Sequence, residues 1–358
     1  MTDTTSVLVT GGAGFIGCAA SAELADRFDR VVVLDNLHPQ IHATQERPAA
    51  LDERAELVVG DVTDPEAVRA VVADARPDVV IHLAAETGTG QSLTESTRHG
   101  MVNVVGTTVL LDALSASDKR PRRIVLSSSR AVYGEGAWRR TDGTVWYPGQ
   151  RTPDMLAEGR WDFEDSEPTP MESGSVHPMP VSVYGTTKLA QEGILSAWAP
   201  AFDVEPVILR LQNVYGPGQS LINSYTGIMS LFCRLAREGT SIPLYEDGEV
   251  RRDFILIDDV ARAIVAAATA EAPGRDPIDI GSGEMQTIRT AAEIISRLYG
   301  APEPHVTGQW RAGDVRHAWA DVSRAADRLG WTPQFSLQQG LEQLVTWIEG
   351  QLPARTSR

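Results

Sequence analysis

The sequence is poor in cysteine, in basic residues and in long apolar segments, and each shortage excludes a class of protein. The two cysteines, Cys18 and Cys233, are too few for a disulfide framework or a cysteine-based zinc site, so no metal is predicted. Lysine and arginine total 32 against 48 acidic residues, and the formal net charge of -16 argues against binding to nucleic acid or an anionic membrane. Residues 1–6 carry no basic leader, and the apolar stretch 261–270 is too short to span a bilayer. We therefore expect a cytoplasmic protein.

Short apolar runs do recur along the chain, and segments with the pattern of helices separate them. Hydrophobic residues make up 42% of the 358 residues, which is enough for a large core. Runs of this kind are typical of parallel strands that are buried on both faces and joined by helical crossovers. The strand candidates are 7–9, 31–34, 57–59, 79–81, 124–126, 207–209 and 278–280, and the helix candidates are 19–26, 288–298 and 337–349. The pattern predicts an α/β fold with a Rossmann-type doubly wound parallel sheet.

These segments divide between two predicted units. Residues 1–209 and 253–280 are expected to form the sheet domain, and residues 210–252 and 281–350 a smaller α/β lobe that binds the substrate. Residues 135–180, called the insert from here on, break the alternation with proline, glycine, acids and tryptophan. A long surface loop, an ordered flap over the substrate and a subunit contact all remain open for the insert.

A glycine-rich turn follows the first predicted strand. Gly12, Gly14 and Gly17 fit the pattern G-x-G-x-x-G, and Gly11 together with Gly14 and Gly17 fits G-x-x-G-x-x-G. Glycines at these spacings let the chain turn tightly and bring backbone N–H groups at a helix N-terminus against a pyrophosphate. Because the turn lies between a strand and a helical segment, it predicts a dinucleotide-binding site.

Asp35 ends the second predicted strand, where a carboxylate is expected to accept hydrogen bonds from the adenosine ribose. A carboxylate there would repel a 2′-phosphate, and no basic residue follows in the next three positions, so NAD is favoured over NADP. Asp61 follows the third strand and is either an adenine contact or a solvated loop residue, while His82 is expected to pack beside the fourth strand. The predicted cofactor-binding residues are Gly11, Gly14, Phe15, Ile16, Gly17, Asp35, Asn36, Asp61, Val62, Leu83, Ala84 and Ala85.

Tyr184 and Lys188 stand one helical turn apart and form a candidate acid/base pair. An unperturbed phenol has a pKa of about 10, so bringing it near neutrality requires a shielded site with positive charge nearby. Ser129 ends the fifth predicted strand, and ligands bind at the carboxyl ends of strands in such sheets. Ser129 is therefore expected to face Tyr184 across the nicotinamide.

Taken together, these motifs resemble the extended short-chain dehydrogenase/reductase family, in its nucleotide-sugar epimerase and dehydratase branch. The resemblance implies Tyr184 as acid/base, Lys188 on the cofactor ribose, Ser129 on the reacting sugar oxygen and Asn103 in the helix below the cofactor. It rests on TGGAGFIG at 10–17, HLAAETG at 82–88, SSSRAVYG at 127–134, YGTTK at 184–188, LRLQNVYGPG at 209–218, RRDFILIDDV at 251–260 and RAGDVRHAWAD at 311–321.

The same resemblance implies a nucleoside-diphosphate sugar as substrate. It places Asn213 and Arg252 against the diphosphate, with Arg316 as a possible helper, because guanidinium groups engage two phosphate oxygens at once. The remaining implied substrate contacts, shared between the base, the nucleotide and the sugar, are Thr87, Pro243, Tyr245, Arg311 and Asp314. A homodimer through helices at 102–113 and 187–199 is also implied.

The choice of reaction depends on two residues after Ser129. Related dehydratases have an Asp-Glu pair there, which supplies the acid and base for elimination of water, whereas this chain has Arg130 and Ala131. The remaining Ser, Tyr and Lys support reversible alcohol oxidation, so we predict NAD-dependent 4-epimerisation through a transient 4-keto sugar. A 4-ketoreductase, a 4,6-dehydratase and a noncatalytic dinucleotide sensor are the alternatives.

A narrower resemblance concerns the sugar. Residues 86–93, the insert and residues 209–228 are similar to bacterial dTDP-L-rhamnose 4-epimerases. A dTDP-6-deoxyhexose is therefore the favoured substrate, with a UDP-hexose or UDP-uronate as the alternative. Some such relatives carry cysteine pairs in the insert, and this insert has none, which argues against a metal there.

Overall fold

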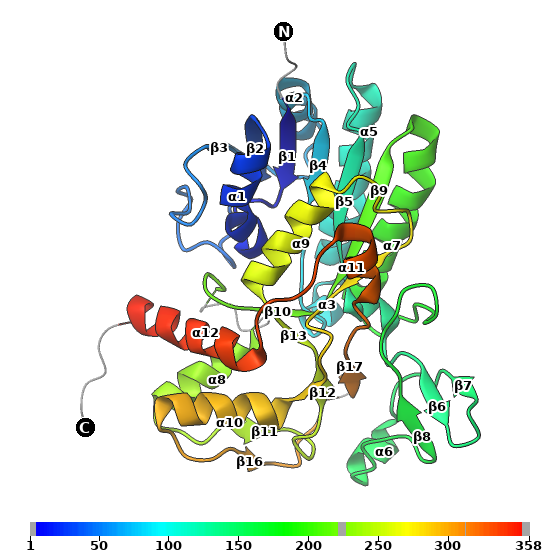
Figure 1. Cartoon of the computed structure of the whole chain (residues 1–358), viewed down its shortest axis with the longest axis vertical. Helices are drawn as coiled ribbons and strands as arrows, with labels where there is room; N and C mark the ends of the chain where they lie inside the picture. Colours follow the sequence, from blue (N-terminus) through cyan, green and yellow to red (C-terminus); the bar gives the residue numbers. More distant parts are fainter. Residues whose placement is uncertain (1–4, 221–226, 312, 353–358) are drawn as a thin grey trace.

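The computed structural model describes residues 5–220, 227–311 and 313–352, and its centre is a seven-stranded sheet (Figure 1). The strands lie in the order β14-β9-β5-β4-β1-β2-β3, and every neighbouring pair is parallel. Their bounds are β1 Ser6–Thr10, β2 Arg30–Asp35, β3 Ala55–Val59, β4 Val79–His82, β5 Arg123–Ser129, β9 Glu205–Leu211 and β14 Ile278–Ile280. The predicted doubly wound sheet is confirmed. Part of the 209–228 motif, residues 221–226, lies outside the described residues.

Helices cover both faces of this sheet because successive side chains of each strand point to opposite faces. In β1, Val7 and Val9 join the core under α1, α9 and α11, whereas Leu8 joins the core under α2, α5 and α7. The bounds are α1 Phe15–Arg27, α2 Pro65–Ala75, α5 Gly106–Ala116, α7 Val183–Trp198, α9 Ile257–Thr269 and α11 Ser323–Leu329. Apolar residues on both faces therefore explain the continuous hydrophobic runs in the sequence.

The start of α7 positions the predicted acid/base pair. Ser182 is extended, and its hydroxyl accepts a hydrogen bond from the backbone N–H of Gly185 at 3.0 Å. Such a cap satisfies one of the free N–H groups of the first turn, so the helix begins at Val183. Tyr184 consequently lies in the first turn, beside the end of the sheet.

A smaller lobe packs below one end of the sheet (Figure 1). Its own core lies among α8, α10 and α12, with Phe232, Ile295 and Leu344 buried at the centre. The bounds are α8 Ile228–Arg237, α10 Ile288–Tyr299, α12 Leu337–Gln351, β10 Asn213–Tyr215, β11 Pro243–Leu244, β12 Arg251–Arg252, β13 Phe254–Leu256, β15 Gln286–Thr287, β16 His305–Val306 and β17 His317–Ala318. The predicted helices at 288–298 and 337–349 are thus confirmed, while the division of the chain into two domains stays a prediction.

The insert is an ordered unit beside this lobe, so its interpretation as a plain surface loop is wrong. Three short strands form an antiparallel sheet in the order β7-β6-β8. Trp138 is fully buried, with its ring 5.0 Å from that of Phe163 and 5.4 Å from that of His317. The bounds are β6 Trp138–Arg140, β7 Val145–Trp146, α6 Pro153–Ala157 and β8 Ser166–Pro168. Burial of these aromatic rings supplies the core that a loop lacks.

Short helical segments complete the described chain. They are α3 Gln91–Thr94, α4 Ser96–His99, a π-helix at Gly100–Val105 and 3-10 turns at Arg130–Tyr133 and Ala199–Phe202. Within the described ranges, no helix is both long enough and apolar enough to cross a membrane.

Candidate active site

A cavity of about 850 Å³ lies at the carboxyl ends of the central strands and brings most of the predicted site residues together. Its wall includes the glycine turn after β1, the ends of β2, β4 and β5, and the first turns of α7. The predicted residues in the wall are Gly11, Gly14, Phe15, Ile16, Asp35, Asn36, Val62, Leu83, Ala84, Ala85, Thr87, Ser129, Tyr184, Lys188 and Asn213. Ligands bind at this end of open parallel sheets, so the cavity is the candidate active site.

Glycine is required in the turn for two different reasons. Gly11 has a φ of 68°, and a Cβ there would lie 2.5 Å from the backbone nitrogen of Ala84. A Cβ at Gly17 would lie 2.3 Å from the carbonyl oxygen of Gly12, so only glycine lets α1 pack against the turn. The result is a helix N-terminus that opens onto the cavity at Phe15, with N–H groups suited to a pyrophosphate.

Asp35 both lines the cavity and braces the turn. One carboxylate oxygen accepts a hydrogen bond from the backbone N–H of Ala13 at 3.0 Å, and the other accepts one from Leu37 at 2.9 Å. Asp61 lies behind this wall, where its carboxylate accepts hydrogen bonds from Thr63 and from the amide of Asn36 at 2.8 Å. Burial raises the pKa of Asp61, but these hydrogen bonds outweigh it and the pKa is lowered. Asp61 thus supports Asn36 but is absent from the cavity wall, and its contact with the adenine stays a prediction.

Two further predicted residues act beneath the cavity wall. Asn103 is fully buried in the π-helix, where its amide exchanges hydrogen bonds with the backbone of Glu86 at 2.8 and 3.0 Å and donates to Thr187 at 2.9 Å. It is absent from the cavity wall, so its role toward the cofactor stays a prediction. His82 is buried between Thr10 and Thr107, which confirms that it packs beside its strand. Burial lowers the pKa of His82 to about 3.

Lys188 is fixed in the floor of the cavity. Its ammonium donates to the carbonyl oxygen of Ser127 at 2.8 Å, and burial lowers the pKa of Lys188 to about 7 against the opposing charge of Glu192. Glu192 is itself held by a bidentate ion pair with Arg210 at 2.7 and 3.0 Å. The lysine is therefore a fixed donor whose charge is sensitive to pH near neutrality.

Tyr184 is half-buried, and the net effect of its surroundings raises its pKa. Burial is the cause, opposed by a hydrogen bond with Ser129 and by the positive charge of Arg130. The sequence predicts Lys188 as a cation that favours phenolate, and this role stays a prediction. The structure adds Arg130 as a positive charge that lowers the pKa of Tyr184. A cation after the fifth strand was visible in the sequence, but only the fold shows that it faces the tyrosine.

Arg130 and Arg252 form a cationic region between the tyrosine and the smaller lobe. Arg130 donates from Nε to the amide oxygen of Asn213 at 2.7 Å, and Arg252 donates to the carbonyl oxygens of Arg251 and Val315 at 2.7 and 2.6 Å. Burial and the charge of Arg130 lower the pKa of Arg252 to about 9. Because these hydrogen-bond partners are neutral, both charges suit an anion such as a diphosphate.

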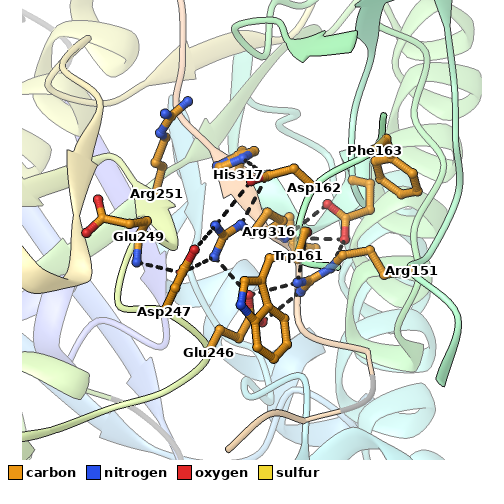
Figure 2. Close-up of polar contacts among 12 residues, drawn as sticks. Arg151, Trp161, Asp162, Phe163, Glu246, Asp247, Glu249, Arg251, Arg316 and His317 are labelled. Atoms are coloured by element: carbon orange, nitrogen blue, oxygen red, sulfur yellow. Dashed lines mark hydrogen bonds and ion pairs between the residues drawn. The ribbon is translucent and has the colours of Figure 1, made fainter. Parts of the chain in front are cut away.

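The predicted nucleotide contacts lie in the smaller lobe, beyond the cavity wall. The guanidinium of Arg311 lies 5.0 Å from the centre of the Tyr245 ring, and Asp314 follows on the same segment. Arg316 was expected to help with the diphosphate, and this is wrong. It is fully buried and pairs with Asp162 and Asp247, as Figure 2 shows. These carboxylates occupy its guanidinium.

The fold and this site define the class of protein. A doubly wound sheet with a glycine turn after β1, and a tyrosine and lysine one turn apart on α7, is the arrangement of a short-chain dehydrogenase/reductase. Residues 7–281 match the NAD dependent epimerase/dehydratase family. The chain belongs to this family, and the fit of the glycine turn and Asp35 to a dinucleotide agrees with NAD as its cofactor.

Individual relatives share nearly the whole length. The chain is 58% identical over 352 residues to a dTDP-L-rhamnose 4-epimerase of Burkholderia thailandensis, covering 98% of this chain and 97% of the relative. It is 29% identical to a UDP-glucose 4-epimerase of Mycolicibacterium smegmatis, with 95% and 97% covered. The UDP-glucose 4-epimerase of Thermotoga maritima, solved with UDP-glucose, has a TM-score of 0.80 at 27% identity, with 97% of this chain and 99% of that chain covered. These comparisons confirm the expectation of an NAD-dependent epimerase.

Proposed function

We propose that the chain catalyses 4-epimerisation of dTDP-L-rhamnose or a closely related dTDP-6-deoxyhexose. The composition of the cavity wall supports this reaction. Tyr184 lies beside Ser129, and Arg130 and Ala131 follow Ser129 in the chain. A wall with this set can move a proton to and from a hydroxyl, but it lacks the carboxylate pair that elimination of water uses. The full-length identity of 58% to a dTDP-L-rhamnose 4-epimerase supports the choice of substrate.

In this proposal the chain handles one proton at the sugar C4 oxygen. Bound NAD supplies a reversible acceptor for the C4 hydride. Tyr184 removes the hydroxyl proton as the alcohol becomes a ketone and returns it when the ketone is reduced. Ser129 hydrogen-bonds the same oxygen. Lys188 is held beneath the site by its hydrogen bond to the carbonyl oxygen of Ser127. The 4-keto sugar turns within the cavity between the two steps, so that it is reduced on its opposite face.

The diphosphate is the part of the proposed substrate that the positive charges of this site suit best. Arg130 and Arg252 approach one another from the sheet and the smaller lobe, and the amide of Asn213 lies between sheet and lobe beside Arg130. Two guanidinium groups with neutral partners match a dianion that stays fixed while the hexose turns. Tyr245 and Arg311 are proposed to hold the base.

We also propose a cytoplasmic homodimer. The implied dimer helices are 102–113, which covers the end of the π-helix and most of α5, and 187–199 in α7; the π-helix exposes Met101 and Val105 at the start of the first of these. Two exposed apolar side chains on one helical turn fit a contact with a second copy of the chain.

The decisive experiment is incubation of the purified protein with dTDP-L-rhamnose without added reduced nicotinamide. Inversion at C4, read by proton NMR as a change in the ring coupling constants, is the expected result. UDP-glucose and UDP-glucuronate serve as comparison substrates. Product formation only with stoichiometric consumption of reduced nicotinamide would identify a ketoreductase instead, and loss of water from the sugar would identify a dehydratase.

A further inference from the structure

Arg151 of the insert joins two segments of the smaller lobe that are far apart in the sequence. Its guanidinium makes a bidentate ion pair with Glu246 at 2.8 and 2.9 Å and donates to the carbonyl oxygen of Asp314 at 2.9 Å. Arg151 and Glu246 are both buried. Figure 2 shows Arg151 reaching the segment after β11, which carries Glu246 and Asp247. A single side chain of the insert thus touches both segments at once.

Glu246 is shared with a second buried arginine. Arg316 donates to Glu246 at 2.9 Å and to both carboxylate oxygens of Asp247 at 2.8 Å, while its Nε donates to Asp162 of the insert at 3.1 Å. Asp162 also lies 2.7 Å from the ring nitrogen of His317. The insert therefore holds the two segments through both an arginine and a carboxylate.

The backbone at Glu246 needs such support. Its φ is 53°, in the left-handed region that a residue with a Cβ rarely adopts. Such a conformation persists only when surrounding contacts over-determine it, and two guanidinium groups on one carboxylate do so here. The residue before it is Tyr245, so the direction of the tyrosine ring is coupled to this geometry.

We propose that Arg151 is a positioning residue for nucleotide recognition, through which the insert holds residues 245–247 against Arg311 and residues 313–316. The first segment carries Tyr245 and the second carries Arg311, whose guanidinium lies 5.0 Å from the tyrosine ring centre. With Arg151 in place the two side chains meet a ligand as one preformed surface. The inference rests on the proposed function in taking a nucleoside diphosphate as the ligand.

Lysine cannot replace this arginine. The guanidinium presents its donors in a planar fork, which engages Glu246 with two parallel hydrogen bonds and still reaches Asp314. An ammonium keeps the charge but not the fork, so Arg151→Lys separates charge from geometry. Glu246→Gln is the partner test, because it keeps the shape of the shared acceptor and removes its charge.

The experiment measures binding of dTDP and UDP, without sugar, to the NAD-loaded wild type and variants by calorimetry, together with KM and kcat. For Arg151→Lys we expect about tenfold weaker dTDP binding and a matching rise in KM, because the loss of preorganisation acts on ground-state binding. We expect a much smaller change in kcat and unchanged NAD affinity. Arg160→Ala is the matched control, since Arg160 belongs to the same insert but makes an exposed ion pair with Glu158.

The outcomes separate the two ideas. Both Arg151→Lys and Glu246→Gln binding dTDP as tightly as wild type would overturn the positioning role. A drop in NAD affinity equal to the drop in dTDP affinity would also overturn it, because a general loss of folding affects both ligands. If the wild type binds neither dTDP nor UDP, the proposed function itself fails.

Discussion

Arg130 donates from Nε to the amide oxygen of Asn213 at 2.7 Å, across 83 residues of sequence. This hydrogen bond fixes the guanidinium where its charge opposes the effect of burial on the pKa of Tyr184. The chain thereby supplies a cation beside the proposed acid/base residue, at a position where the family resemblance implies an acid in dehydratases. The same contact ties the sheet to the first residue of β10 in the smaller lobe.

Removal of the Arg130 charge should shift the pH dependence of catalysis. Arg130 lowers the pKa of Tyr184, so Arg130→Met is expected to raise that pKa and move the rising limb of the kcat profile to higher pH. Arg130→Lys, which keeps the charge, is the matched control and should move it less. The other groups that face Tyr184 are Ser129, the edge of the His99 ring and Lys188 of the same helix. Profiles that coincide in all three proteins would contradict the assignment.

Tyr184→Phe should abolish most of the turnover while leaving the fold intact. Loss of a positioned acid/base group costs about 10²–10⁴-fold in rate. NAD binding should persist, because the glycine turn and Asp35 are untouched. The measurement is C4 inversion by NMR alongside NAD content, and full turnover by the variant would show that another group carries the proton.

Lys188 should leave a signature in stability as a function of pH. Burial lowers its pKa to about 7, so above that pH the unfolded chain binds the proton and the folded chain does not. The free energy of unfolding gains from this residue as pH rises from about 7 toward the unfolded value of about 10.4. Lys188→Met lacks this contribution. Urea unfolding of both proteins across that range tests it, and parallel curves would rule it out.

Gly11→Ala should prevent NAD binding through sterics alone. The new Cβ would lie 2.5 Å from the backbone of Ala84, at a φ of 68°. Gly90→Ala is the control, because Gly90 has an ordinary helical φ of -67° and open space around its Cβ position. Fluorescence titration with NAD should separate the two variants, and equal affinity would show that the turn can relax.

The sequence predicted those features whose cause is local. The buried strands and the glycine turn follow from short runs of residues, and the spacing of Tyr184 and Lys188 follows from one helical turn. The three-stranded sheet of the insert was not predictable, because β6 pairs with β8 across a segment that has no strand pattern of its own. Arg316 was misassigned for the same reason, since its partner Asp162 lies 154 residues away. Only the fold brings those carboxylates to it.

The interleaving of the chain also governs the order in which the protein can assemble during synthesis. The edge strand β14 joins β9 only after residue 280 has emerged, and Arg316 reaches Asp162 of the insert only later still. Such long-range pairings make folding slow, because segments made early stay without their partners until later segments are synthesised. A nascent chain can therefore build its cofactor-binding turn early, but its nucleotide-binding half is completed near the end of translation. Expression of a chain that ends between β9 and β14 would leave β9 as an exposed edge.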